Sequence, residues 1–319
     1  MLRWLEPFAS GRTDGAVHVS RAGSVSQADL YLDTDDRRFH RAGYSLRIRR
    51  KGRRVGGEAT LKALETGRPG TGPLVRREVT EPLDRSDAAA LLNAPGPVGE
   101  RVRALVGSRR LLPLFEVRTR RQTFDLHTED STAAGELALD ETTIRSQAGR
   151  TLARLRRVEV ETPGPPPAAV AAFVERLREA SGLHEATLSK YEAGYVATGP
   201  HRPTVPSYGS TAIGPDLSIE AVAFATLRRH FTALVTKEPG TRLGDDIEDL
   251  HDMRVATRRL RAALSLFRDV LSAEAAALRE ELGWLGRALG SVRDLDVQLE
   301  QLDEWVTALA EPDREPLER

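Results

Sequence analysis

The sequence of 319 residues contains no cysteine. A disulfide-stapled scaffold, a thiolate metal site and a cysteine nucleophile are therefore excluded, and the redox state of the compartment is left open. No apolar run approaches the roughly 20 residues that a membrane-spanning helix needs. Residues 1–15 also lack the basic-then-apolar pattern of a secretory signal. A soluble cytoplasmic protein is the expected class.

Net charge is absent as well, because Lys and Arg together number 47 and Asp and Glu together number 47. A site for a polyanion would therefore have to be a local cluster. There is neither a G-x-x-x-x-G-K-[ST] loop nor a G-x-G-x-x-G turn, so nucleotide binding through a helix N-terminus is unsupported. Six of the seven histidines show no metal-ligand spacing, and we expect them in surface or packing roles.

The pattern of the chain changes near Glu161. Before it, short alternating segments punctuated by Gly and Pro predict strands. These strands are expected at residues 30–33, 46–50, 59–63, 75–80, 115–125, 135–143 and 152–161. Short helical patterns occur at residues 86–92 and, after three prolines, at 168–180.

Residues 200–215, rich in Pro, Gly, Ser and Thr, predict a linker. Helices are expected after it, at residues 219–236, 245–271, 273–290 and 293–310. The sequence thus predicts an α+β protein with a β-rich domain at 1–199, a linker at 200–216 and an all-α domain at 217–319.

Charged residues alternate along several predicted strands, which puts them on one face of each strand. Arg47 and Arg49 share a face, as do Glu136 and Asp140, and Glu159 and Glu161. Because unpaired buried charge is costly, this face must be wet. If it faces outward, the charges are ordinary surface residues. If it faces inward, the domain is a barrel whose lumen holds both charge signs, which suits metal-assisted phosphoryl chemistry.

The predicted helix at 245–271 carries a second constellation. His251, Arg254, Arg258 and Arg261 recur at helical spacing and form one cationic stripe. Arginine presents planar donor pairs that match phosphate oxygens. The alternative is a solvated helix face that is neutralised by the acidic residues at 245–249, which also suit a helix N-terminus.

The order of the strand motifs resembles the CYTH superfamily, the triphosphate tunnel metalloenzymes. The motifs that carry this resemblance are Tyr31-Leu32-Asp33-Thr34, Gly43 to Arg49, Thr60-Leu61-Lys62, Arg77-Glu78, Thr119-Arg120-Arg121, Glu136 to Asp140, Glu159 to Glu161 and Ser189-Lys190-Tyr191. The resemblance spans Tyr31 to Tyr191. It implies an antiparallel β-tunnel with flanking helices.

The resemblance also implies roles for single residues. The triphosphate would be bound by Arg47, Arg49, Lys62, Arg118, Arg121 and Lys190. Arg118 would need a bulge to reach the lumen. Glu159 and Glu161 would bind Mg²⁺ or Mn²⁺, and Glu78 and Asp140 would support the metal, the water or the basic residues during hydrolysis.

Residues 251–261 and 285–297 resemble the signature helices of the CHAD family, the conserved-histidine α-helical domain. That resemblance implies a helical bundle that binds inorganic polyphosphate. Its binding residues would be His251, Arg254, Arg258, Arg259 and Arg261.

The order of the two domains resembles bacterial inorganic triphosphatases. It implies binding and metal-dependent hydrolysis of inorganic triphosphate, with no nucleic-acid or membrane partner. Two departures keep alternatives open. No E-x-E-x-K motif precedes Tyr31, and only one histidine-bearing helix occurs where the CHAD family has two, so about half of the helical domain is expected. The alternatives are a non-catalytic polyphosphate-binding module and a tunnel enzyme that acts on thiamine triphosphate or ATP.

Overall fold

The computed structural model describes residues 13–14, 17–52, 56–64, 77–129, 132–199 and 205–308. The chain forms two compact units. The first comprises Met1–Asp35 and Gly43–Arg202, and the second comprises Asp36–Ala42 and Pro203–Arg319. Within the described ranges, no helix is long and apolar enough to cross a membrane.

The first unit is built on one antiparallel sheet with the strand order β5-β4-β3-β2-β6-β7-β8, and β1 pairs with β2 outside this path. The strands are β1 (Thr13–Asp14), β2 (Val17–Thr34), β3 (Tyr44–Lys51), β4 (Gly57–Ala63), β5 (Glu78–Leu83), β6 (Leu111–Thr128), β7 (Ala133–Ser146) and β8 (Thr151–Glu161). In the part of the chain that is described, no ladder joins β5 to β8, so these two strands form the edges.

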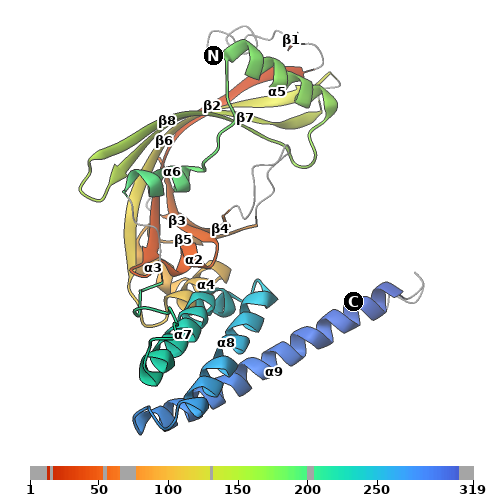
Figure 1. Ribbon diagram of the computed structural model, residues 1–319. Helices are drawn as coiled ribbons and strands as arrows, with labels where there is room; N and C mark the ends of the chain where they lie inside the picture. The colour runs from red at the N-terminus through yellow and green to blue at the C-terminus, as the bar shows by residue number, and fades with distance from the viewer. Residues whose placement is uncertain are drawn as a thin grey trace. The chain divides into compact units, whose positions relative to one another are not determined.

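The long strands β2, β6, β7 and β8 are strongly bent (Figure 1). Register shifts interrupt their ladders between Arg21 and Gly23, between Tyr31 and Leu32, and between Leu126 and His127. An extra residue on one strand of a pair bends that strand and increases its twist. The bend gives the sheet two distinct faces, which we call inner and outer.

The outer face is covered by helices near both ends of the sheet. At one end, α5 (Ala168–Ser181) packs Val170, Phe173 and Leu177 against buried residues of β2, β6 and β7. At the other end, α4 (Pro97–Val106) packs on β4 and β5, next to α3 (Ala88–Asn93). The Glu81 carboxylate accepts hydrogen bonds from the backbone N–H groups of residues 96, 98 and 99, which fixes the start of α4.

The inner face carries α6 (Lys190–Ala197). The Tyr191 ring lies 5.4 Å from the Tyr31 ring and 6.1 Å from the Phe115 ring. Ser189 and Glu192 form a capping box that begins this helix. Gly194 is required because a Cβ there would lie 2.2 Å from Phe115 Cε2. These contacts hold α6 against the strands and set the position of its first residue, Lys190.

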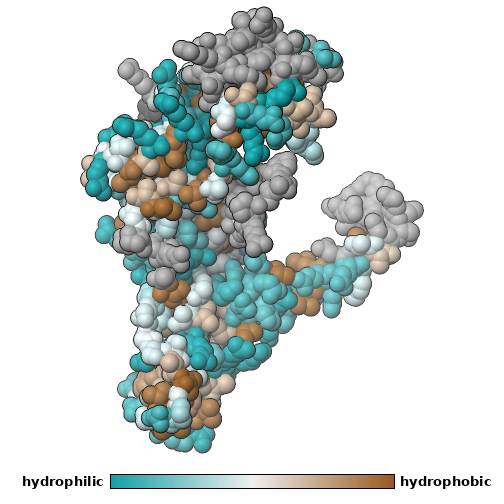
Figure 2. Space-filling view, turned by 45° about the horizontal axis from the view of Figure 1, so that its top comes forward, coloured by the Kyte–Doolittle hydropathy of each residue, from teal (hydrophilic) through white to brown (hydrophobic). Residues whose placement is uncertain are grey.

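The second unit is helical. It contains α2 (Arg38–Arg41), α7 (Ile219–Leu243), α8 (Ile247–Leu266) and α9 (Glu274–Ala308). Leu234, Leu250, Met253, Leu260 and Leu289 form its buried core. Apolar surface is visible along α9 in Figure 2. The exposed large apolar residues of this helix include Leu278, Trp284, Val292, Leu295, Leu299, Leu302 and Trp305.

The predicted succession of an antiparallel β domain with helices and an all-α region is confirmed. Several boundaries differ. β2 begins at Val17 rather than Leu30, because its N-terminal half pairs with β6 although its sequence shows weak alternation. α4 was not predicted, and its start depends on the distant Glu81. The two helices expected on either side of Gly290 form the single helix α9. Residues 75–76 of the expected fourth strand lie outside the described residues.

Candidate functional site

The strand registers bring the predicted charged residues to one face of the sheet. Residues that lie directly opposite each other in an antiparallel ladder point to the same side. Asp29 is opposite Arg49, Lys62 is opposite Glu78, and Arg121 is opposite Asp140. Two-residue alternation extends this relation along each strand. This inner face therefore carries nearly all the site residues expected in the first unit.

One cluster lies on β2, β3, β4 and β5. Arg49 donates from Nε and Nη2 to the two Asp29 carboxylate oxygens, and both distances are 2.7 Å. Arg47 Nη1 lies 3.6 Å from Asp29 Oδ2, and its Nη2 donates to Glu78 Oε1 at 3.2 Å. Lys62 Nζ donates to the other Glu78 oxygen at 2.6 Å. Three cations are thus held in place by two carboxylates.

A second cluster lies on β6, β7, β8 and α6. Arg121 donates to both oxygens of Asp140, at 2.9 and 2.8 Å, and also to Glu159. Lys190 Nζ donates to Asp140 Oδ2 at 2.5 Å and to Glu159 Oε1 at 2.7 Å. The Asp140 side chain is fully buried, while Glu159 is partly exposed. The result is a closed ring of two cations and two anions on a half-buried surface.

The ring holds its carboxylates in the ionised form. Burial alone would raise the pKa of Glu159, but the Lys190 ammonium and the Arg121 guanidinium outweigh burial and lower that pKa. Burial opposes ionisation of Asp140 in the same way, and hydrogen bonds from Arg121 and Lys190 lower its pKa. The hydrogen bond to Asp140 is the main reason that the pKa of Arg121 is raised. Every member of the ring is therefore charged at neutral pH or bound to a charged partner.

Some polar atoms of the inner face remain unsatisfied. Arg47 Nε and Thr60 Oγ1, on directly opposite residues of β3 and β4, are buried without a hydrogen-bond partner. Gln27 Nε2, on the same face of β2, is buried in the same state. An unsatisfied buried donor costs about 1–3 kcal/mol. These atoms can accept or donate hydrogen bonds to a polar molecule that enters the inner face.

The two predicted metal ligands share this face but differ in their surroundings. Glu159 is held by Lys190 and Arg121, whereas the Glu161 side chain is 68% exposed and lies 3.8 Å from Arg121 Nη1. Among the described residues, no group of three or more His, Asp or Glu is arranged to hold a metal. Mg²⁺ commonly takes one or two carboxylates together with substrate phosphates and water. Glu159 and Glu161 fit that partial ligand set.

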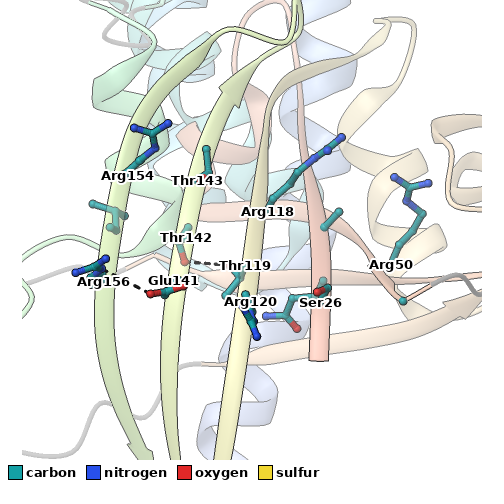
Figure 3. Close-up of a pocket in the computed structure, with 14 residues that line it drawn as sticks. Ser26, Arg50, Arg118, Thr119, Arg120, Glu141, Thr142, Thr143, Arg154 and Arg156 are labelled. Atoms are coloured by element: carbon teal, nitrogen blue, oxygen red, sulfur yellow. Dashed lines mark hydrogen bonds and ion pairs between the residues drawn. The ribbon is translucent and has the colours of Figure 1, made fainter. Parts of the chain in front are cut away.

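Arg118 does not join the inner cluster. The β6–β7 ladder runs without a register shift from Phe115 to Leu126, so Arg118 points to the outer face. It hydrogen-bonds Glu116 there and lines a hollow (Figure 3). The bulge that would have brought it to the lumen is absent from this part of β6, and the expected role of Arg118 at the inner face is corrected accordingly.

Two inner-face residues were missed. Asp29 lies just before the strand that was expected to begin at Leu30, and it pairs with both arginines of β3. Arg157 lies directly opposite Asp140 on β8. Both follow the two-residue alternation of residues that were identified, namely Tyr31 for Asp29 and Glu159 for Arg157. Extending each alternation by one step would have found them.

In the second unit, the basic residues of α8 fall on the two flanks of its buried face. Arg254 and Arg261 lie beside α9, where a Cβ on Gly290 or Gly283 would be 3.7 Å or 3.5 Å from the respective guanidinium. His251 is half-buried, and Arg258 is exposed between these arginines in the helical pattern. The stripe predicted from spacing therefore follows one side of α8.

Arg259 lies apart from that stripe, since its charge acts together with burial to lower the pKa of His230 on α7. The acidic residues before the stripe do not neutralise it. Asp249 and Asp252 bind Lys237 of α7, at 3.0 and 2.9 Å, and Asp246 caps α8. In the described part of the chain, the arginines at 254, 258, 259 and 261 form no ion pair.

Comparisons with known proteins agree with the two resemblances. The family model of the CYTH domain matches residues 10–195, and the model of the CHAD domain matches residues 225–319. No curated protein matches the chain.

Three solved structures share the fold of part of the chain. A candidate adenylate cyclase from Bacillus halodurans is 23% identical, with a TM-score of 0.38, over 59% of this chain and 87% of its own. A candidate adenylyl cyclase from Hippeastrum, described as having a dominant triphosphatase activity, is 16% identical, with a TM-score of 0.36, over 60% and 88%. A protein from Pyrococcus horikoshii is 17% identical, with a TM-score of 0.33, over 54% and 85%.

Proposed function

Because the chain belongs to the CYTH family, whose members bind triphosphate substrates and depend on a divalent metal, we propose that its inner sheet face binds and hydrolyses inorganic triphosphate. Mg²⁺ or Mn²⁺ is the proposed cofactor, since the available ligands are hard carboxylate oxygens. The observation that carries the proposal is the ring of Arg121, Asp140, Glu159 and Lys190, where both charge signs meet on a half-buried surface.

The residues have separate tasks in this proposal. Arg47, Arg49 and Lys62 on one side, and Arg121 and Lys190 on the other, bind the phosphate oxygens. Their carboxylate partners hold them in position before the substrate arrives, so little reorganisation is needed during the reaction. The unsatisfied donor Arg47 Nε gains a partner from the substrate.

Glu159 and Glu161 would hold the metal, which when bound neutralises phosphate charge and orients the transferred group. Glu78 and Asp140 keep the basic residues in place, because each carboxylate accepts hydrogen bonds from two cations. The attacking water approaches a terminal phosphoryl group in line with the bond that breaks. Positioning and charge neutralisation supply most of the rate enhancement in this scheme.

The second unit has a binding role in the proposal. Its stripe of His251, Arg254, Arg258 and Arg261 binds inorganic polyphosphate, and Arg259 adds positive charge on the other flank of α8. The support is the absence of ion pairs at these arginines in the described residues, which leaves their donors available to phosphate oxygens.

The test is phosphate release from tripolyphosphate with Mg²⁺ or Mn²⁺, measured on the parent chain, on Glu159→Gln and on Glu179→Gln. Glu179 is exposed on α5, so its substitution is a matched carboxylate-to-amide control. We expect Glu159→Gln to lower the rate at least about 100-fold, and the control to match the parent.

Two outcomes contradict the proposal in different ways. Full activity in Glu159→Gln would refute the role of this carboxylate in metal binding. No release by a folded parent chain that binds polyphosphate would favour the non-catalytic module, which the missing three-ligand metal group also favours. Parallel assays with ATP and thiamine triphosphate separate the proposed substrate from the other tunnel chemistries.

A further inference from the structure

The outer face of the sheet contains a hollow of about 830 Å³ that the inner-face chemistry does not use. It lies on strands β3, β2, β6, β7 and β8, between the end covered by α5 and the end covered by α4 (Figure 3). Its most prominent side chains are five arginines, at positions 50, 118, 120, 154 and 156. The helices leave bare the part of the face where these arginines lie.

The registers arrange the arginines in two rows across the strands. Ala28 is opposite both Arg50 and Arg118, and Thr143 is opposite both Arg118 and Arg154, so Arg50, Arg118 and Arg154 form one row. Neighbouring strands lie about 4.8 Å apart, which separates successive arginines of this row by about 10 Å and its two ends by about 19 Å.

The second row lies two residues along the strands, at a distance of about 7 Å. It contains Arg120 on β6 and Arg156 on β8, with Glu141 of β7 between them. Small residues, among them Ser26 and Gly52, occupy the remaining positions of the hollow. A chain-like ligand can therefore lie flat on the strands between the guanidinium groups.

Little negative charge balances these arginines. Glu116 binds Arg118 at 2.9 Å and lies 4.0 Å from Arg50, and Glu141 lies 3.7 Å from Arg156. Arg120 and Arg154 form no ion pair with any residue that the structure describes. Five arginines thus face two carboxylates, and the Arg118 and Arg156 side chains are 54% and 83% exposed. On the inner face, by contrast, cations and carboxylates are closely matched.

From this arrangement we propose that the outer hollow binds an inorganic polyphosphate chain that is longer than a triphosphate. The row from Arg50 to Arg154 spans a distance that three phosphorus atoms joined through single oxygens cannot cover. No aromatic side chain lines the hollow, so the stacking platform that single-stranded nucleic acids use is missing. Exposed guanidinium groups at repeated spacing suit a repeating anion without bases.

The experiment compares two pairs of Arg→Gln substitutions in the full chain, each introduced together with Arg254→Ala and Arg258→Ala to weaken the binding proposed for the second unit. The hollow pair is Arg118→Gln with Arg154→Gln. The control pair is Arg85→Gln with Arg178→Gln, two exposed arginines of the first unit that lie outside the hollow. Affinity for long-chain polyphosphate is measured as a function of salt, and circular dichroism checks folding.

We expect the hollow pair to weaken polyphosphate binding at least about tenfold, and to reduce the slope of log K against log salt by between one and two. Equal affinity and equal slope in the hollow and control pairs would overturn the proposal. Displacement of polyphosphate by a single-stranded oligonucleotide at equal phosphate concentration would overturn the assignment of the ligand. Failure of tripolyphosphate hydrolysis would refute the inner-face proposal alone, because this measurement reports binding.

Discussion

Replacing Lys190 by Met tests the idea that the ring on the inner face is held together by its ammonium group. Lys190 Nζ lies 2.5 Å from Asp140 and 2.7 Å from Glu159, and its side chain is only 11% exposed. Removing one partner of a buried ion pair costs about 3–5 kcal/mol. Arg121 remains bound to both carboxylates and Glu159 reaches solvent, so we expect a loss of about 2–4 kcal/mol at neutral pH.

The loss should depend on pH in a definite direction. The folded protein holds the pKa values of Asp140 and Glu159 below their ordinary values of 3.8 and 4.5. Such groups stabilise the fold above those ordinary values, and their contribution disappears as pH falls through the lowered folded values. Lys190→Met removes part of the lowering. The difference between parent and variant should therefore be largest at neutral pH and should narrow below pH 4 or so.

The assay is urea unfolding followed by hydrogen exchange of peptides from β7 and β8, with Asp140→Asn and the double variant completing a cycle. Lys237→Met is the matched control, because Lys237 also bridges two carboxylates, Asp249 and Asp252, but is 34% exposed. Its loss, followed on peptides of α7, should stay below about 1 kcal/mol. A coupling energy below about 0.5 kcal/mol between Lys190 and Asp140, or equal losses in variant and control, would refute the reasoning.

Two further predictions concern the second unit and the seat of α6. Arg254→Ala combined with Arg258→Ala should weaken polyphosphate binding and reduce its salt slope by between one and two, as measured by titration at several salt concentrations; an unchanged slope would contradict the proposed stripe. Gly194→Ala should destabilise the first unit by about 1–3 kcal/mol in urea unfolding, because the new methyl group meets Phe115. Gly214→Ala, with open space around its Cβ, is the control.

Much of the inner face could be predicted because alternation along a strand is a local property. Arg47 and Arg49, like Glu159 and Glu161, must share a face wherever the strand lies. The pairing of these residues could not be predicted, because it depends on the register between strands far apart in the sequence. Asp29 illustrates this point: its partner Arg49 is set by the β2–β3 ladder.

Arg118 shows the opposite case, in which local alternation should have decided. Arg121 and Arg118 are an odd number of residues apart on one strand, so an uninterrupted strand puts them on opposite faces. Including both in one site required a bulge, and the ladder has none there. In α8, spacing separated Arg259 from the stripe, but its closeness to His230 depends on how α7 packs.

The zero net charge of the chain conceals how differently one sheet presents its arginines on its two faces. On the inner face, Arg49 and Arg121 are each bound by a buried carboxylate, so a phosphate must compete with a partner already in place. Competition at a half-buried site favours short, highly charged ligands that can satisfy several cations at once. On the outer face, Arg120 and Arg154 meet solvent, where attraction is screened by salt and grows with the number of contacts. The same strands are thus suited to a compact anion on one side and to an extended anion on the other.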